Sequence, residues 1–142
     1  MANFLYNSAK TGFVNGTIDW DDSTIKAMLV KDTYTPDKDH KFVADVTPAS
    51  NELSDASYSR KTLQNKTVTQ DDVNDVAKVD SDDLTWTAIN AGTAAGMVIY
   101  KENTGDADNV LIAYINDGGF PVTTNGGDLI MEFNAEGIIQ LA

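Results

Sequence analysis

Met97-Val-Ile-Tyr100 and Val110-Leu-Ile-Ala-Tyr-Ile115 are the two runs that decide the fold of this 142-residue chain. Both are short and rich in β-branched and aromatic residues, a composition that favours β-strands. Between them lies Asn103-Thr-Gly-Asp106, whose residue types tolerate positive φ angles and favour turns. The pattern therefore predicts antiparallel strands joined by short turns.

The rest of the last sixty residues repeats this alternation of short strands and turns. Further strand-like runs are Leu84-Thr-Trp-Thr-Ala-Ile89, Leu129-Ile-Met-Glu-Phe133 and Ile138-Ile-Gln-Leu141. The turns between them are Asp117-Gly-Gly, Asn125-Gly-Gly-Asp and Asn134-Ala-Glu-Gly. Regular short strands separated by such turns predict an all-β fold, either an antiparallel β-sandwich or a jelly-roll-like meander.

One strand near the N-terminus is predicted to be central. In Thr24–Val30, Ile25, Ala27 and Leu29 lie on one face, and Met28 and Val30 lie on the other. Since successive side chains of a strand point to opposite faces, this strand is apolar on both sides. We therefore expect it to be buried inside a sheet.

The remaining segments give weaker patterns. Leu5, Ala9 and Phe13 are spaced four apart before Asn15-Gly16, which predicts a short helix over residues 4–14 with a glycine cap. Residues 31–56 are polar and contain Pro36 and Pro48, so we expect a long loop with a short strand at Phe42–Val46. We call residues 31–56 the excursion. Exposed strands are expected at Tyr58–Val68 and Val73–Val79.

Composition limits what the chain can do. Its length suits one domain, residues 1–142, and it has no cysteine for disulfides or thiolate sites. The net charge of −12 argues against binding nucleic acid or an anionic membrane. No run approaches the roughly 20 apolar residues that span a bilayer. Residues 102–142 hold seven acids and no base, which predicts an acidic face.

Two groups of residues have the chemistry of a catalytic site but lack its context. His40 lies in the polar run Asp37-Lys-Asp-His-Lys41, without a second histidine or a nucleophile motif. We therefore interpret it as a solvated loop histidine. Asp19, Asp21 and Asp22 flank Trp20 and suit a glycosidase site in type. Acids in a turn beside a buried tryptophan explain the same residues, so we expect no catalytic residue.

Two acidic segments carry the oxygen ligands that calcium prefers, namely Asp80-Ser-Asp-Asp83 and Asp106-Ala-Asp-Asn109. Neither has the twelve-residue loop and the terminal glutamate of an EF-hand. We interpret both as solvated acidic loops, with a structural cation as the open alternative. The sequence thus predicts no metal site and no cofactor.

The chain as a whole resembles small virion structural proteins of tailed bacteriophages, of the head decoration or accessory type. The residues that carry the resemblance are Phe4-Leu-Tyr6, Gly12-Phe-Val-Asn-Gly-Thr-Ile-Asp-Trp20, Thr24-Ile-Lys-Ala-Met-Leu-Val30, Tyr34-Thr-Pro36, Ala94-Ala-Gly-Met-Val-Ile-Tyr-Lys101, Leu111-Ile-Ala-Tyr-Ile115 and Pro121-Val-Thr-Thr-Asn-Gly-Gly-Asp128. They are of a kind that shapes a fold, so the resemblance transfers no active site.

The resemblance implies a non-enzymatic protein that binds the major capsid protein and copies of itself. It would be made in the host cytoplasm and end on the virion, on the capsid surface. The first alternative is a tail or neck component that forms rings, or a fibre-associated module. The second is a carbohydrate-binding adhesin using Trp20 or Trp86. The expected contact residues are Phe4, Leu5, Tyr6 and Phe13 of the N-terminal segment and Tyr34 and Phe42 of the excursion. These residues could equally cover the open end of the domain's own core.

Overall fold

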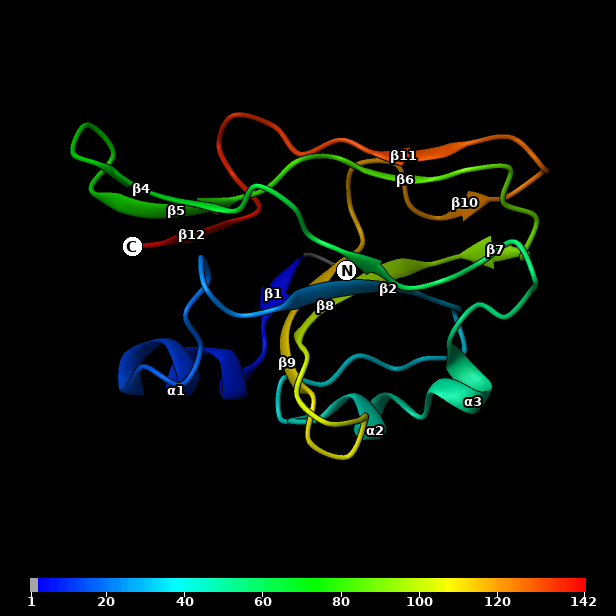
Figure 1. Ribbon diagram of the computed structural model, residues 1–142, viewed down its shortest axis with the longest axis horizontal. Coiled ribbons are helices and arrows are strands. Elements are labelled where there is room, and N and C mark those ends of the chain that lie inside the picture. Colours follow the sequence, from blue (N-terminus) through cyan, green and yellow to red (C-terminus); the bar gives the residue numbers. More distant parts are fainter. Residues whose placement is uncertain (1–2) are drawn as a thin grey trace.

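A five-stranded antiparallel sheet forms the middle of the molecule (Figure 1). The computed structural model describes residues 3–142. The sheet has the strand order β1-β9-β8-β2-β3. Its strands are β1 (Phe4–Leu5), β2 (Ile25–Val30), β3 (Lys61–Thr62), β8 (Gly96–Lys101) and β9 (Val110–Ile115).

Smaller sheets lie above this central sheet in Figure 1, and three short helices lie below it. The upper strands are β4 (Thr67–Asp71), β5 (Val76–Asp80) and β12 (Ile139–Leu141), with the pairs β6 (Leu84–Trp86) and β11 (Leu129–Met131), and β7 (Thr93–Ala94) and β10 (Val122–Thr123). The helices are α1 (Asn7–Asn15), α2 (Val43–Val46) and α3 (Pro48–Asn51). Strands dominate and all pairings are antiparallel, so the all-β prediction is confirmed.

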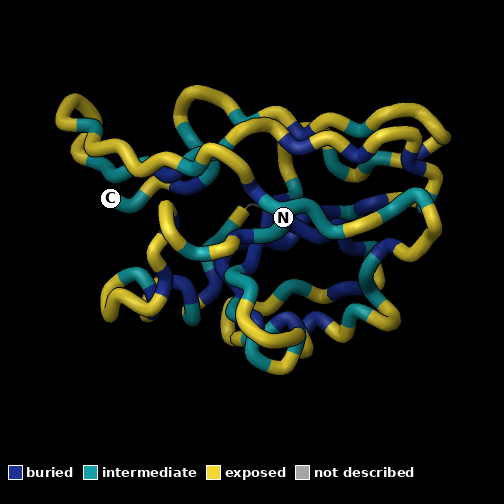
Figure 2. Tube along the Cα trace, in the orientation of Figure 1, coloured by how far each residue is buried: buried dark blue, intermediate teal, exposed yellow. Residues whose placement is uncertain are grey.

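The central sheet is buried on both faces. Ile25, Ala27 and Leu29 of β2 belong to the core beneath the small sheets, which we call the sheet-side core. Met28 and Val30 belong to a second core beneath the excursion, the excursion-side core. All five side chains have no exposed area, which confirms the prediction that this strand is central. Figure 2 shows the buried positions following the middle of the molecule.

Strands β8 and β9 repeat this two-sided burial. Met97 and Ile99 of β8 face the sheet-side core, whereas Val98 and Tyr100 face the excursion-side core. The register between β8 and β9 shifts at Ile99/Tyr100, which leaves Ile112 outside the paired residues. Its carbonyl accepts a hydrogen bond from the Tyr6 N–H at 3.0 Å. The irregularity thus provides an attachment point for the N-terminal segment.

The N-terminal helix is shorter than predicted. Phe4 and Leu5 form β1 and pair with Tyr114 and Ala113, so the helix begins at Asn7. Pairing with β9 gives hydrogen-bond partners to backbone groups that would have none in the first turn of a helix. This gain outweighs the helical spacing of Leu5, Ala9 and Phe13. The helix ends at Asn15, and Gly16 adopts a φ of 78° as the expected glycine cap.

The predicted strand at Phe42–Val46 is wrong, because Val43–Val46 form the helix α2 and only Phe42 makes a bridge, to Val110. Val43 and Val46 still point into the excursion-side core, and a single helical turn places both there. The exposed strands predicted at Tyr58–Val68 and Val73–Val79 are present only in part. Strands form at Lys61–Thr62, Thr67–Asp71 and Val76–Asp80, with a turn between the last two.

Among residues 3–142, no helix has the length and apolar character needed to cross a bilayer. The longest helix, α1, has nine residues.

The close approach of Gly96 to Tyr114 gives a test of this packing. A Cβ atom added at Gly96 would lie 2.6 Å from the Tyr114 hydroxyl oxygen, and the Tyr114 ring is 4% exposed. We expect Gly96→Ala to lower the free energy of unfolding by about 1–3 kcal/mol, because a buried ring must move. Denaturant unfolding measures this change. Gly105→Ala is the control, since its Cβ would meet nothing within 4 Å, and equal effects of both changes would contradict the packing.

Candidate interface around the N-terminal segment

Four aromatic rings join the N-terminal segment to the excursion and to β9. The Phe4 ring lies 5.0 Å from the Tyr6 ring and 5.6 Å from the Tyr114 ring, measured between centroids. Tyr34 of the excursion lies 5.9 Å from Tyr114 in an edge-to-face arrangement. Such offset pairs are favourable beyond their buried area. The two segments in which the sequence placed its contact residues therefore meet in one cluster.

A chain of hydroxyl contacts runs through this cluster. The hydroxyl oxygens of Tyr6 and Tyr34 are 2.9 Å apart, and the Tyr34 hydroxyl lies 3.1 Å from His40 Nδ1. Burial raises the pKa of the Tyr6 and Tyr34 hydroxyls, so both stay protonated as hydrogen-bonding groups at neutral pH. His40 is half-buried and packs beside Tyr34. It is therefore not the solvated histidine that the sequence suggested, but a partner in this chain.

The six expected contact residues divide into two groups. Tyr6 has no exposed area and Tyr34 is 5% exposed, because their rings fill the space between the central sheet and the excursion. Both are therefore part of the core and offer no surface to a partner. Phe4, Leu5, Phe13 and Phe42 are half-buried, with one part of each side chain left at the surface. For these four, contact with a partner stays a prediction.

Phe42 is held in place by a capped turn. The backbone N–H groups of Lys41 and Phe42 both donate to Asp45 Oδ2 at 2.9 Å. These bonds, first that from Phe42, hold the pKa of the Asp45 carboxyl below its usual range. The Lys41 ammonium lies 5.0 Å from the centre of the Phe42 ring. Phe42 is thus presented from an ordered backbone beside β9.

Three shallow hollows surround the N-terminal segment. The first, of about 340 Å³, lies between β1 and β12 and is lined by Phe4, Leu5 and Ile138. The second and third, of about 500 Å³ each, lie between the N-terminal segment and the excursion. The charged residues at the three hollows and at the Phe42 turn are Lys10, Lys38, Lys41, Asp37, Asp39 and Asp45. In a protein of net charge −12, this surface is locally balanced.

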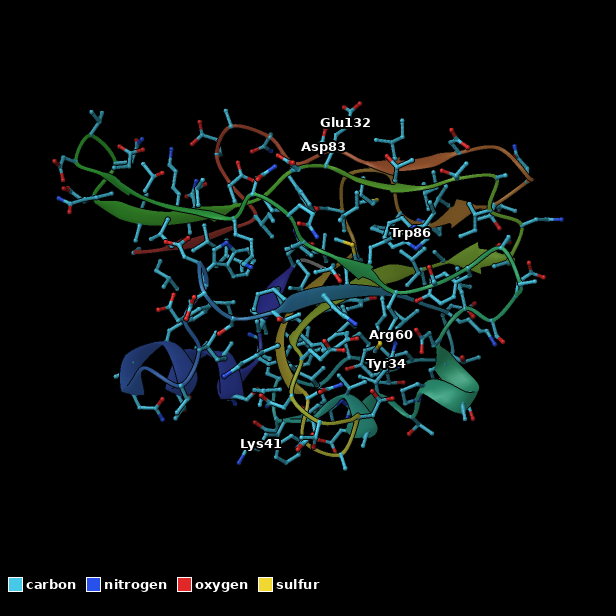
Figure 3. All side chains as sticks on the ribbon, viewed as in Figure 1. Tyr34, Lys41, Arg60, Asp83, Trp86 and Glu132 are labelled. Carbon is cyan, nitrogen blue, oxygen red and sulfur yellow. The ribbon has the colours of Figure 1, made fainter. Side chains whose placement is uncertain are left out.

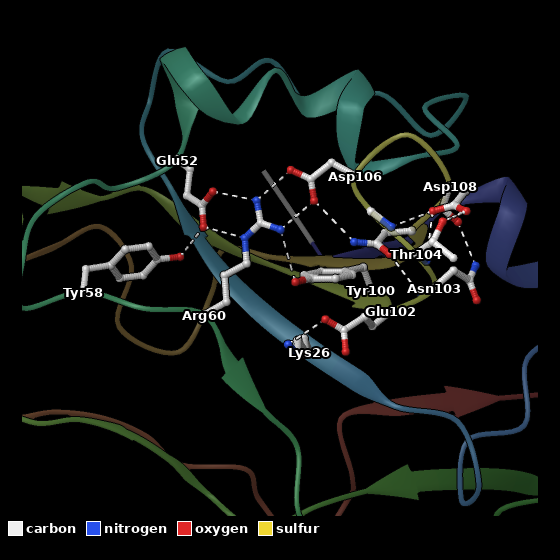
Figure 4. A network of polar contacts seen from close by, with 12 residues as sticks. Lys26, Glu52, Tyr58, Arg60, Tyr100, Glu102, Asn103, Thr104, Asp106 and Asp108 are labelled. Atoms are coloured by element: carbon white, nitrogen blue, oxygen red, sulfur yellow. Dashed lines mark hydrogen bonds and ion pairs between the residues drawn. The ribbon is translucent and has the colours of Figure 1, made fainter.

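A second polar cluster has the residue types of an active site (Figure 4). The Arg60 guanidinium binds Glu52 through two nitrogens at 2.8 Å each and Asp106 at 2.7 and 3.0 Å. It also donates to the Tyr100 hydroxyl at 3.2 Å, and its carbon lies 5.4 Å from the Tyr100 ring centre. The Tyr58 hydroxyl donates to Glu52 at 2.7 Å. Arg60 is the single arginine of the chain, and its planar fork suits this double pairing.

This cluster is structural. Glu52 lies near the end of the excursion, Arg60 precedes β3, and Asp106 lies in the turn between β8 and β9, so the ion pairs join the excursion to the central sheet. The hydrogen bonds that Arg60 donates to Glu52 raise the pKa of Arg60, and the Arg60 guanidinium lowers the pKa of Asp106. Both carboxylates are paired with the same permanent cation.

Several aspartates that the sequence singled out accept hydrogen bonds from the backbone of their own loops. Asp108 accepts hydrogen bonds from the backbone N–H groups of Thr104 and Gly105, and from the Thr104 hydroxyl. Asp19 likewise accepts from the backbone N–H groups of Asp21 and Asp22. Across residues 3–142, no group of three or more acidic or histidine side chains is arranged to hold a metal ion.

The two tryptophans that the adhesin alternative needs are buried. Trp20 is 2% exposed and donates its indole N–H to the Asp80 carbonyl, and Trp86 is 1% exposed and donates to the Ser59 carbonyl. In Figure 3, Trp86 lies between the central sheet and the small sheets, on the opposite side from Tyr34 and Arg60. Neither ring offers a face to a sugar, so that alternative loses the residues on which it rested.

Comparison of the chain with protein-family models, with curated proteins and with solved structures finds no match.

The two carboxylates on Arg60 should differ in their contribution to stability. The Glu52 side chain is 12% exposed and the Asp106 side chain 38% exposed. We expect Glu52→Gln to cost about 1.5–3 kcal/mol, the range for a buried bond to a charged group. Asp106→Asn should cost about 1 kcal/mol or less, since solvent screens the more exposed pair. Denaturant unfolding measures both, and a larger loss in Asp106→Asn would contradict this order.

The lowered pKa of Asp106 gives stability a defined dependence on acid. A carboxyl whose pKa is lower in the folded state stabilises the fold above its unfolded pKa of about 3.9. That stabilisation is lost as the pH falls through the lowered pKa of the folded state. Thermal unfolding from pH 6 down to about pH 2 should therefore show a shallower pH dependence for Asp106→Asn than for the parent. Asp32→Asn, at an exposed position, is the control. Identical profiles for all three proteins would exclude the effect.

Proposed function

We propose that this chain is a non-enzymatic structural protein of a tailed-bacteriophage virion, and that it binds the outside of the assembled head as a decoration protein. The resemblance of its sequence to such proteins supports the proposal. The segments that carry the resemblance include β2, β8 and all but the first residue of β9, which together form the two-sided core. The resemblance at these places therefore concerns the framework of an antiparallel fold.

The observation that carries the proposal is the surface around the N-terminal segment. Phe4 and Leu5 lie on the edge strand β1, and Phe42 lies beside β9, all three half-buried. Hollows of about 340 and 500 Å³ adjoin Phe4 on either side. Half-buried aromatic side chains held on a rigid backbone beside a hollow are suited to protein contacts, since little conformational freedom is lost on binding.

A decoration protein would act by mass action. If it binds neighbouring coat subunits only when they are assembled, its binding free energy adds to the stability of the shell. Nothing in this mechanism needs a catalytic group.

The contact surface can be tested on heads of the parent virus that lack this protein. We expect Phe4→Ser and Phe42→Ser each to weaken binding about tenfold or more in a co-sedimentation assay, as for anchors at an interface. Val14→Ser is the control, since Val14 is 90% exposed on α1 and lies outside the three hollows. A loss of binding caused by Val14→Ser alone would place the contact elsewhere.

Binding through this charge-balanced surface should change little as the salt concentration rises.

The position on the virion is tested separately by cryo-electron microscopy of purified particles. Density over the capsid surface at a copy number near that of the coat protein is the expected result. Density confined to the tail or neck would overturn decoration and favour the ring-forming alternative.

A further inference from the structure

The hairpin of β4 and β5 carries an open strand edge. The three-stranded sheet has the order β12-β5-β4, so β4 has a neighbour on one side only. Every other edge strand of the described sheets is three residues long or shorter, whereas β4 has five residues. Alternate residues of such an edge direct their backbone N–H and C=O groups outward. In Figure 1, this hairpin extends away from the body of the molecule.

This edge lacks the usual protection against pairing. Thr67-Val-Thr-Gln-Asp71 contains no proline, and its pairing with β5 runs without a register shift. Its β-branched residues favour a strand, while natural edge strands are often interrupted by proline, bulges or inward-pointing charges. Two of the four large apolar side chains that are exposed in residues 3–142 lie on this hairpin, Val68 at 51% and Val73 at 91%.

We propose that β4 pairs antiparallel with β4 of a second copy of this chain, joining two three-stranded sheets into one six-stranded sheet. The contact is symmetric, so each copy provides the same strand to the other. This inference goes beyond the proposed function, because it concerns only two copies of the chain and holds whether or not they bind a capsid.

The backbone restricts the register of this pairing. Outward-facing residues of one strand must meet outward-facing residues of the other, so the two-fold axis passes through a residue pair and not between pairs. The register centred on Thr69 pairs Thr69 with itself, Val68 with Gln70 and Thr67 with Asp71. It keeps all five residues of β4 in the ladder, whereas centring on Val68 or Gln70 leaves part of the strand unpaired.

Charge complementarity selects the same register. Lys66 precedes β4 and Asp72 follows it. Centring on Thr69 places Lys66 of each copy opposite Asp72 of the other, so two lysine–aspartate pairs form at the ends of the ladder. The register centred on Val68 would place Lys66 opposite Gln70, and the one centred on Gln70 would place it opposite Asn74. Only the centred register brings Lys66 to a carboxylate.

Cross-linking tests this geometry directly, because the chain has no cysteine of its own. In Thr69→Cys, the two sulfurs would meet across the axis, where opposite Cα atoms lie about 4.5–5.5 Å apart, within the range for a disulfide. Val68→Cys is the matched control. Its two cysteines would be diagonal neighbours across the two strands, about 7–8 Å apart instead of directly opposite each other. Under mild oxidation we expect a covalent dimer from Thr69→Cys and little from Val68→Cys. Equal yields, or more dimer from Val68→Cys, would overturn the register.

Charge reversal tests the contact without any cross-link. Sedimentation equilibrium of the parent chain at physiological salt should show a dimer, and Lys66→Glu should raise its dissociation constant about tenfold. The double variant Lys66→Glu, Asp72→Lys restores both pairs and should return the dissociation constant toward that of the parent. Lys31→Glu, which changes the net charge equally beside α3, is the control. A monomer at all attainable concentrations, or a dimer unaffected by Lys66→Glu, would overturn the proposal.

Discussion

The structure depends on the burial of both faces of strands β2, β8 and β9. A sheet with one wet face needs only one covering layer, but this sheet needs two, and the chain supplies them from different parts. The small sheets cover one face, and the excursion with its helices covers the other. The ion pairs of Arg60 lie where the excursion joins the central sheet.

The excursion illustrates how a mostly polar segment can cover an apolar face. It contributes a few buried side chains, among them Tyr34, Val43 and Val46, and is then held by polar contacts. The Tyr6–Tyr34–His40 chain attaches its first part, and the ion pairs of Arg60 attach its last part. Because each of these groups is paired, together they hold the excursion against the central sheet, beside the surface around Phe4 and Phe42.

The acidic character of the chain is distributed by folding. Residues 102–142 carry seven acids and no base, yet Glu102, Asp106 and Glu136 form ion pairs with Lys26, Arg60 and Lys78 from earlier in the chain. The acidic charge of this C-terminal segment is therefore partly neutralised by bases from earlier in the chain. The two surfaces that we propose as contacts are the locally balanced one at the N-terminal segment and the strand edge of β4. Both suit contacts between proteins.

The sequence alone predicted the all-β class, the central strand at residues 25–30 and the glycine cap after Asn15. These features follow from the alternation of apolar and polar residues and from turn-forming residues, which are properties of neighbours in the chain. Only the tertiary structure decided three other features. Phe4 and Leu5 pair with β9, and the rings of Tyr6 and Tyr34 are buried. Glu52 and Asp106 both form ion pairs with Arg60. Each of these joins residues far apart in the chain, and no local pattern specifies which distant segment will supply the partner.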